Sequence, residues 1–418
     1  MQQKTTRHED RVPHLRRGFI APKVNNRAKR DPLVLALTLL LLAAPIARAQ
    51  WDIQDSRTTA SLRGIANVGA GVAWASGTEG TVLRTEDGGY LWQGCATPPG
   101  AEKLDFRGIQ AFDENTAIVM SSGKGDLSRL YKTTDGCRTW KLLFTNPDKE
   151  GFWDAIQFET IPQNKKTQCF GALVGDPVNG NFPMFLSFDC GNKWERQIKQ
   201  FPPPLTGEGL FAASNSSLLL KGLSRRAFVT GGISGARVLQ YLVEADDTRG
   251  PADFEAKVAP GAKKLVYRPR HMQVDMLPWN VLSTSSGAFS IGSRVAERTF
   301  LDSEVIVGGD YSAPEHVGIA AYGFLGGSSA DWHPAQTPPH GYRSAVAYDP
   351  TTKTWITVGP NGTDISRDDG KNWRPLKPTA SEPPDADKNW NALSLPFVVG
   401  PKGRIGKLRG DALKPANP

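Results

Sequence analysis

Short apolar runs separated by polar turns dominate the chain from about residue 50 onward. Residues 80–84, 129–132 and 183–186 are runs of this kind, each rich in aliphatic, β-branched or aromatic side chains. No long stretch carries apolar residues three and four positions apart, which is the spacing that an amphipathic helix requires. The pattern therefore predicts an all-β chain built from many short strands.

One turn pattern recurs after these runs: Ser or Thr, any residue, Asp, any residue, Gly, two residues and Trp. Full copies occupy residues 85–92, 187–194 and 366–373, and a near copy at 133–140 has Cys137 in place of the glycine. The hydroxyl and the carboxylate can accept backbone N–H groups across a tight turn, and the glycine supplies positive φ. The Trp begins the next strand and buries a large apolar face. The residues to which we assign this structural role are Thr85, Asp87, Gly89, Trp92, Thr133, Asp135, Trp140, Ser187, Asp189, Gly191, Trp194, Ser366, Asp368, Gly370 and Trp373.

The recurring turn resembles the Asp-box, or BNR, repeat, and several copies in one chain predict a β-propeller. Seven segments align as candidate innermost strands, so we expect a seven-bladed propeller over residues 50–410, followed by a C-terminal tail, 411–418. The last blade lacks a fourth strand, and we expect residues 51–55 to pair into it and close the ring. The blades are expected near residues 58–97, 104–146, 152–200, 205–260, 285–337, 340–377 and 388–410 plus 51–55.

The fourth blade departs most from the repeat because it has no recurring turn. We expect residues 207–210 to be its innermost strand and residues 253–258 to be its outer strand. An insertion of roughly residues 260–284, containing several Lys and Arg residues, is expected to follow.

The first 49 residues have the composition of a secretory signal peptide. A basic segment, 4–30, precedes an apolar run, 33–46, and Ala47-Arg48-Ala49 then forms a cleavage signature. We expect export to the periplasm or the exterior, with retention of the segment as an N-terminal anchor as the alternative. The segment holds 10 of the 50 basic and 3 of the 42 acidic residues, which leaves 40 − 39 = +1 for the rest. The basic isoelectric point is therefore no argument for a nucleic-acid partner.

Four cysteines, an even number in a chain expected to be exported, permit two disulfides and three possible pairings. We favour Cys95 with Cys137 and Cys169 with Cys190. The sequence contains no two cysteines separated by two residues and no cluster of histidines, so we expect no metal site. Nucleotide-binding and nucleophile motifs are absent too, and we expect no cofactor.

The second position of each candidate inner strand is expected to face the central channel. Three of these positions are arginines and two are carboxylates, and guanidinium groups can bind carboxylates in a bidentate manner. Alternatively, pairs of these opposite charges simply fill the channel. The candidates for partner binding are Arg63, Arg107, Asp154, Glu208, Arg343 and Asn391, with Gly287 at the seventh position.

Three segments near the C-terminus resemble exported bacterial BNR-repeat proteins, which in turn are similar to photosystem II stability and assembly factors. They are Gly-Tyr-Arg-Ser-Ala-Val at 341–346, Val-Gly-Pro-Asn-Gly-Thr-Asp-Ile-Ser at 358–366 and Gly-Arg-Ile-Gly-Lys-Leu at 403–408. The resemblance implies a seven-bladed, non-enzymatic scaffold, expected as a monomer, that contacts a client protein, such as a membrane protein under assembly, through inner arginines. Arg63, Arg107 and Arg343 match such positions, whereas Asp154, Glu208 and Gly287 depart from an all-arginine pattern.

Two alternatives belong to other functional classes. The first is a propeller that binds carbohydrate or takes part in cell-surface interactions. The second is a sialidase-like glycoside hydrolase, in which three arginines hold a carboxylate beside a Tyr–Glu nucleophile pair and an acidic residue. The residues that would form such a set here are Arg63, Arg107, Arg343, Asp154, Glu208 and Tyr342. Sialidases have six blades and a Phe-Arg-Ile-Pro signature that this chain lacks, so we assign no catalytic residue. The blade count and the presence of a Tyr hydroxyl beside Glu208 discriminate between these functions.

Overall fold

The computed structural model describes residues 50–163, 166–197, 201–223, 225–246, 254–255, 266–279, 282–295, 302–325, 332–380 and 382–413. The chain divides into two compact units, Met1–Ile46 and Ala47–Pro418, and the second holds all the strands described below. The predicted signal peptide lies outside the described residues. None of the helices in the described part is long and apolar enough to cross a membrane.

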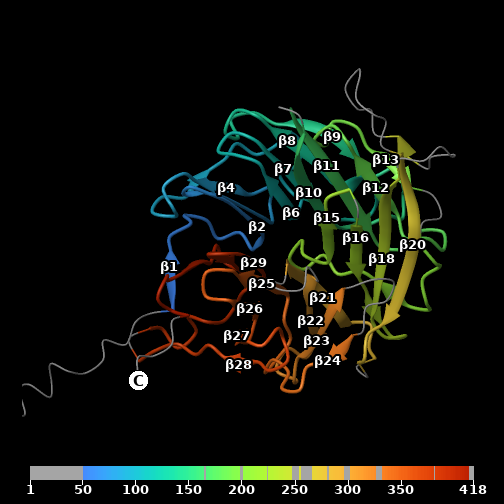
Figure 1. Cartoon of the computed structure of the whole chain (residues 1–418). Coiled ribbons are helices and arrows are strands. Elements are labelled where there is room, and N and C mark those ends of the chain that lie inside the picture. Colours follow the sequence, from blue (N-terminus) through green and yellow to red (C-terminus); the bar gives the residue numbers. More distant parts are fainter. Residues whose placement is uncertain are drawn as a thin grey trace, which may run out of the picture. The chain divides into compact units, whose positions relative to one another are not determined.

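Seven antiparallel sheets form the blades of a β-propeller, with their first strands gathered toward the middle (Figure 1). The first three blades have four strands each, in sequence order, and a 3-10 turn, η1 (Gly125–Leu127), precedes β8. Their strands are β2 (Leu62–Gly69), β3 (Val72–Gly77), β4 (Val82–Thr85) and β5 (Gln93–Gly94); β6 (Phe106–Ala111), β7 (Ala117–Ser121), β8 (Arg129–Thr133) and β9 (Lys141–Thr145); and β10 (Trp153–Gln163), β11 (Lys166–Gly175), β12 (Met184–Ser187) and β13 (Glu195–Gln197).

The fourth and fifth blades are larger. The fourth is a five-stranded sheet in the order β15 (Leu218–Lys221), β16 (Arg225–Val229), β18 (Arg237–Asp246), β20 (Val266–Met276) and β19 (Phe254–Glu255). The fifth has six strands in the order β14 (Glu208–Gly209), β17 (Gly231–Gly232), β21 (Ser286–Val295), β22 (Asp302–Asp310), β23 (Ile319–Leu325) and β24 (His333–Pro334).

The last two blades complete the ring. The sixth comprises β25 (Ala345–Asp349), β26 (Thr354–Gly359), β27 (Gly362–Ser366) and β28 (Arg374–Pro375). The seventh comprises β29 (Ala392–Ser394), β30 (Phe397–Val399), β31 (Ile405–Leu408) and, as its outer strand, β1 (Trp51–Gln54). The predictions of an all-β fold, seven blades and closure of the ring by the N-terminal strand are confirmed.

The expected organisation of the fourth blade is wrong in two respects. Residues 207–210 do not form its inner strand, because β14 pairs with β17 in the neighbouring sheet. The inner strand is β15, which packs Leu218 and Leu220 into the core. The expected insertion contains β20, which pairs with β18 from Met276 to Val266 with one register shift and lies between β18 and β19.

The four recurring turns share one hydrogen-bond arrangement. In the first, the Gly89 N–H donates to Thr85 Oγ1 at 3.0 Å, and the Leu91 N–H donates to Asp87 Oδ1 at 3.0 Å. Cys137 adopts a φ of 63° and donates its N–H to Thr133 Oγ1 at 3.0 Å, in the place of the glycine. The hydroxyl and carboxylate therefore fix these turns, as their chemistry predicts.

The cysteines pair only in part as predicted. Cys95 and Cys137 form a disulfide that joins the end of the first blade to the turn of the second. Cys169 and Cys190 are free, so the second predicted disulfide is not formed in this structure. The two thiols are hydrogen-bonded to each other, and burial raises the pKa of Cys169 and thereby disfavours its reactive thiolate.

Candidate functional site

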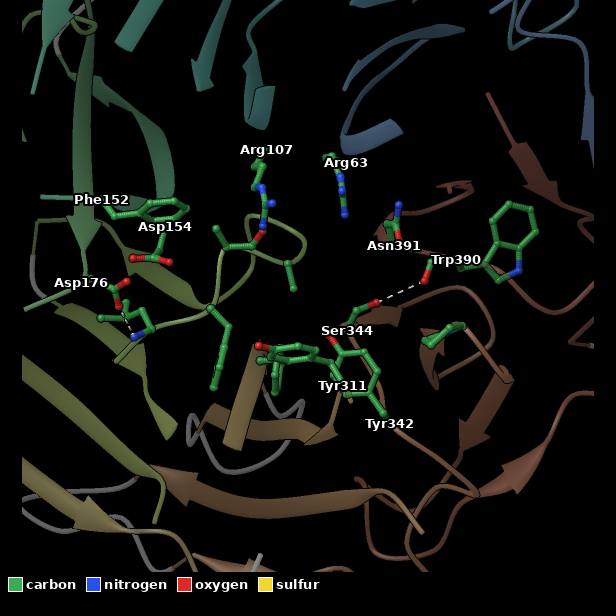
Figure 2. A pocket seen from close by; sticks show the side chains of 16 residues that line it. Arg63, Arg107, Phe152, Asp154, Asp176, Tyr311, Tyr342, Ser344, Trp390 and Asn391 are labelled. Carbon is green, nitrogen blue, oxygen red and sulfur yellow. Dashed lines mark hydrogen bonds between the residues drawn. The ribbon is translucent and has the colours of Figure 1, made fainter. Parts of the chain in front are cut away.

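A cavity of about 470 Å³ lies among the innermost strands. Its walls combine charged residues from the first three blades with aromatic residues from the fifth and sixth (Figure 2). The residues that line it are Arg63, Arg107, Phe152, Asp154, Asp176, Leu210, Phe211, Ala212, Ala213, Phe289, Tyr311, Tyr342, Ser344, Pro360, Trp390 and Asn391.

β-Bulges place the charged side chains in the cavity. The pairing register of the inner strand shifts around Arg63 in β2, around Arg107 in β6 and around Asp154 in β10. A fourth shift surrounds Phe289 in β21. A bulge adds one residue to a strand and redirects its side chain. Each of these four blades therefore presents its bulged residue to the central cavity.

Arg63 and Arg107 project side by side into the cavity and share one carboxylate (Figure 2). Arg107 Nε lies 2.8 Å from Asp105 Oδ2, and Arg63 Nε lies 3.8 Å from Asp105 Oδ1. Arg107 Nη1 also donates to the carbonyl oxygen of Ala212 at 3.2 Å. The pKa of Arg63 is lowered, mainly by burial. The carboxylate of Asp105 opposes this decrease, and the positive charge of Arg107 adds to it. Two guanidinium groups thus face one carboxylate, which leaves an excess of positive charge.

The carboxyl groups of Asp154 and Asp176 lie on another wall of the cavity (Figure 2). Asp176 Oδ1 accepts the Leu210 N–H at 2.9 Å. Asp154 is only 1% exposed, and its Oδ2 has no hydrogen-bond partner among the described residues. Burial raises the pKa of Asp154 well above its usual value, Asp176 raises it further, and Arg107 lowers it. Burial also raises the pKa of Asp176.

Stacked aromatic rings form a further wall. Phe211 and Phe289 stack with ring centroids 4.0 Å apart, and Tyr311 meets both rings edge-on. Tyr342 packs against Phe289 at 4.7 Å, and burial raises the pKa of its hydroxyl. This wall is mainly apolar, so it can hold the uncharged part of a ligand while the charged walls orient its ends.

Four of the six predicted partner-binding residues meet in the cavity: Arg63, Arg107, Asp154 and Asn391. Arg343 and Glu208 lie elsewhere, which corrects the prediction that all six face the channel. Arg343 is completely buried, and its Nε donates to Asp364 Oδ2 at 2.8 Å.

The two exceptions have different causes. Residue 343 precedes β25, whose pairing with β26 contains no bulge, so the neighbours Tyr342 and Ser344 face the cavity instead. Glu208 belongs to β14 rather than to an inner strand, and its Oε1 accepts from Arg237 Nε at 2.7 Å.

Sequence reasoning did not assign Asp176, Tyr311 or Pro360 to the site. Each follows the strand that pairs with the bulged or inner strand of its blade (β10, β21 or β25): β11, β22 and β26 end one residue before them. In an antiparallel pair the end of the second strand lies beside the start of the first. A search for side chains at that position, combined with the inner-strand alignment, would have found them.

The arrangement expected of a sialidase-like site is not assembled. Glu208 and Arg343 lie outside the cavity, and the ring has seven blades rather than six. Within the described part of the chain, no group of three or more His, Cys, Asp and Glu residues is placed to hold a metal ion.

No family model and no curated protein sequence matches the chain. Its fold is similar to that of a solved structure, YCF48 bound to D1 peptide, with a TM-score of 0.51 and 14% identity, over 87% of this chain and 97% of that one. Other similar structures are YCF48 from Cyanidioschyzon merolae, with a TM-score of 0.49 and 18% identity over 87% and 99% of the two chains, and the WD40 β-propeller domain of Doa1. The Doa1 domain has a TM-score of 0.48 and 8% identity, over 88% and 100%. The first similarity confirms the predicted resemblance at the level of the propeller fold.

Proposed function

We propose that this protein is an exported, non-enzymatic scaffold that binds a protein partner at the central cavity. The pair of arginines is the observation that carries the proposal. Arg63 and Arg107 reach the same space from adjacent blades, and their side chains are 31% and 30% exposed. Because Asp105 neutralises only one positive charge, a carboxylate of a partner can complete the pair with charge-assisted hydrogen bonds.

Exposed apolar side chains on the loop after β17 and on the segment that follows it in space favour a protein over a small anion as the partner. Ile233, Met276 and Leu282 are 45%, 54% and 60% exposed. Met276 and Leu282 both approach Gly235, since a Cβ built there would lie 3.1 Å and 3.8 Å from their side chains. The loop that contains these contacts follows β17, which pairs with β14 directly before Leu210 of the cavity wall. Exposed apolar side chains that gather on one part of the surface are typical of protein interfaces.

The fold comparison supports the same conclusion. The propeller with a TM-score of 0.51 was solved with a peptide bound, so this architecture accommodates a protein ligand. By analogy, the partner of this chain is a membrane protein during assembly. The analogy concerns the class of partner, because the identity is only 14%.

Capture from the native envelope fraction tests the proposal. Full-chain protein should retain a specific protein partner, and the double variant Arg63→Gln/Arg107→Gln should lose it while melting at the same temperature. Arg374→Gln changes an exposed arginine on β28 and serves as the matched control. Equal capture by the double variant and the control would contradict the proposal. Binding to a glycan array, without a protein partner, would replace it with the carbohydrate-binding alternative.

Export is part of the proposal and rests on the composition of residues 1–49. The disulfide between Cys95 and Cys137 suits an oxidising compartment. N-terminal sequencing of the protein from the periplasmic fraction should give Gln50 as the first residue. Recovery of the uncleaved chain in the cytosolic fraction alone would contradict export.

A further inference from the structure

The carboxyl pair in the cavity has no role in the function proposed above. Asp154 and Asp176 lie together on a wall distinct from that of the two arginines (Figure 2). A site for a carboxylate alone would not need two further carboxyl groups facing the same space, because they repel such a ligand. Their presence calls for a ligand of different chemistry.

The geometry around Asp154 leaves an acceptor unused. Asp154 is 1% exposed, lies at a bulge that directs it into the cavity, and has no hydrogen-bond partner for Oδ2 among the described residues. Buried carboxylate oxygens are normally paired, and an unpaired one is costly. Asp176 directs one oxygen to Leu210 N, which fixes its position beside Asp154.

The nearby arginines do not donate a hydrogen bond to Asp154 Oδ2. Arg107 forms its ion pair with Asp105 at 2.8 Å and donates to Ala212, so its guanidinium is held on the other wall. Arg63 is likewise nearest to Asp105. The cavity of about 470 Å³ is large enough for two side chains of a ligand.

We propose that the cavity binds a segment that carries both signs of charge: an acidic group at Arg63 and Arg107, and a lysine or arginine side chain at Asp154 and Asp176. This inference rests on the proposed function and specifies the partner as a protein that inserts an acidic and a basic side chain. The charged walls then discriminate against segments that carry only one of the two groups. Without the basic side chain, the buried carboxyl pair has no counter-charge, and without the acidic group, the excess positive charge of Arg63 and Arg107 stays unneutralised.

Binding of the basic side chain is linked to proton release. Without a ligand, burial raises the pKa values of both carboxyl groups, repulsion by Asp176 raises that of Asp154 further, and a retained proton is favoured. The groups that face the pair are Arg107 and Arg63, with Tyr311 and Tyr342 on the aromatic wall. A cationic side chain favours the ionised carboxylates and displaces the proton, so affinity for it increases with pH.

Blocked hexapeptides are suitable probes, arranged as an array with glutamate and lysine in both orders and at spacings of zero to three residues. Matched peptides replace the lysine with norleucine or the glutamate with glutamine. For the full-chain protein, we expect the best bipolar peptide to bind at least about tenfold tighter than its norleucine counterpart, or about 1.4 kcal/mol. Calorimetry in two buffers of different ionisation enthalpy should show proton release with the bipolar peptide.

The variant Asp154→Asn/Asp176→Asn should lose the tenfold gain and the proton release, and still bind the norleucine peptide. Arg63→Gln/Arg107→Gln should lose both peptides, and Glu102→Gln, at an exposed site, should bind like the natural protein. A gain that survives in the aspartate variant, or no binding of any bipolar peptide at about 1 mM, overturns the inference.

The inference and the proposed function fail separately. Arginine-dependent capture of an envelope protein without any gain from lysine would leave the function intact and refute the bipolar site. Absence of such capture would refute the function itself.

Discussion

Closure of the ring depends on one short strand, and Trp51 supplies most of its buried surface. β1 pairs with β31 over four residues, from Trp51 opposite Leu408 to Gln54 opposite Ile405. Trp51 is 2% exposed, and its ring centroid lies 5.8 Å from that of Trp390. Replacement of a buried aromatic residue by alanine removes apolar burial and leaves a cavity, at a cost of about 3–5 kcal/mol. We therefore expect Trp51→Ala to lower the free energy of unfolding by that amount.

The expected change in melting temperature follows from the size of the propeller. Unfolding entropy is about 2.1 cal/mol/K per residue, which gives about 0.8 kcal/mol/K for residues 50–413 if the ring unfolds as one unit. The loss at Trp51 then corresponds to a decrease of about 4–7 °C. Differential scanning calorimetry measures the shift directly.

Ile53→Ala is the control on the same strand. Ile53 is 44% exposed, so its truncation should change the free energy of unfolding by less than about 1 kcal/mol. Equal shifts for the two variants, or an unchanged melting temperature for Trp51→Ala, would refute the argument that burial of Trp51 holds the ring closed. Deletion of residues 50–54 should have a larger effect, because it also exposes β31 as an unpaired edge.

Four further predictions concern other buried or hydrogen-bonded groups. Arg343→Met removes the ion-pair partner of the buried Asp364, which keeps its contact with His340 Nδ1, and should reduce stability in urea by about 3 kcal/mol; unchanged stability would contradict a structural role. Cys95→Ser/Cys137→Ser opens a loop of 42 residues and should cost about 4 kcal/mol, whereas equal urea midpoints with and without the disulfide would refute this. Hydrogen bonds from the recurring turn lower the pKa of Asp135 from 3.8 to about 2, so the stability that its carboxylate contributes above pH 3.8 should be lost as the pH falls toward 2. In Asp135→Asn, the urea midpoint should therefore change less with pH between 3.8 and 2. Burial raises the pKa of Asp154 in the folded protein, so the stability present below pH 3.8 is lost as the pH rises from there through the raised pKa; Asp154→Asn should raise the melting temperature at pH 8 and not at pH 3, and a decrease at pH 8 would refute this.

The blades could be predicted because the residues that fix each recurring turn lie within one short segment of the sequence. A hydroxyl and a carboxylate fix each turn within eight residues, and the same hydrogen bonds appear at Thr85 and Thr133. Closure of the ring was predictable from a count, since the last blade lacked one strand and the N-terminal segment offered one.

The site was predictable only where a local feature decided the direction of a side chain. A charged residue between an apolar residue and Gly or Ala lies at a bulge in β2, β6 and β10, and it faces the cavity there. Arg343 follows the same sequence alignment, but the chain before β25 has no bulge and the side chain turns to Asp364. In the fourth blade, a long connection separates β18 from β20, and no recurring turn marks the pairing. Pairing across such a distance is decided by tertiary contacts, which the local pattern does not contain.

Several buried charges in this propeller are paired within the fold, whereas Arg226, Asp154 and Asp387 each keep a side-chain atom without a hydrogen-bond partner among the described residues; of these three, Asp154 alone lines the central cavity. Buried arginines outside the cavity include several with a carboxylate partner, so these ion pairs are satisfied within the fold and fix strands to one another. Asp154 is as deeply buried, yet its free oxygen faces a cavity, and its ionised form destabilises the folded state. A destabilising group that the fold could replace with an amide at little structural change is best explained by a ligand that satisfies it. The satisfied pairs are Arg225–Glu304, Arg237–Glu208 and Arg343–Asp364.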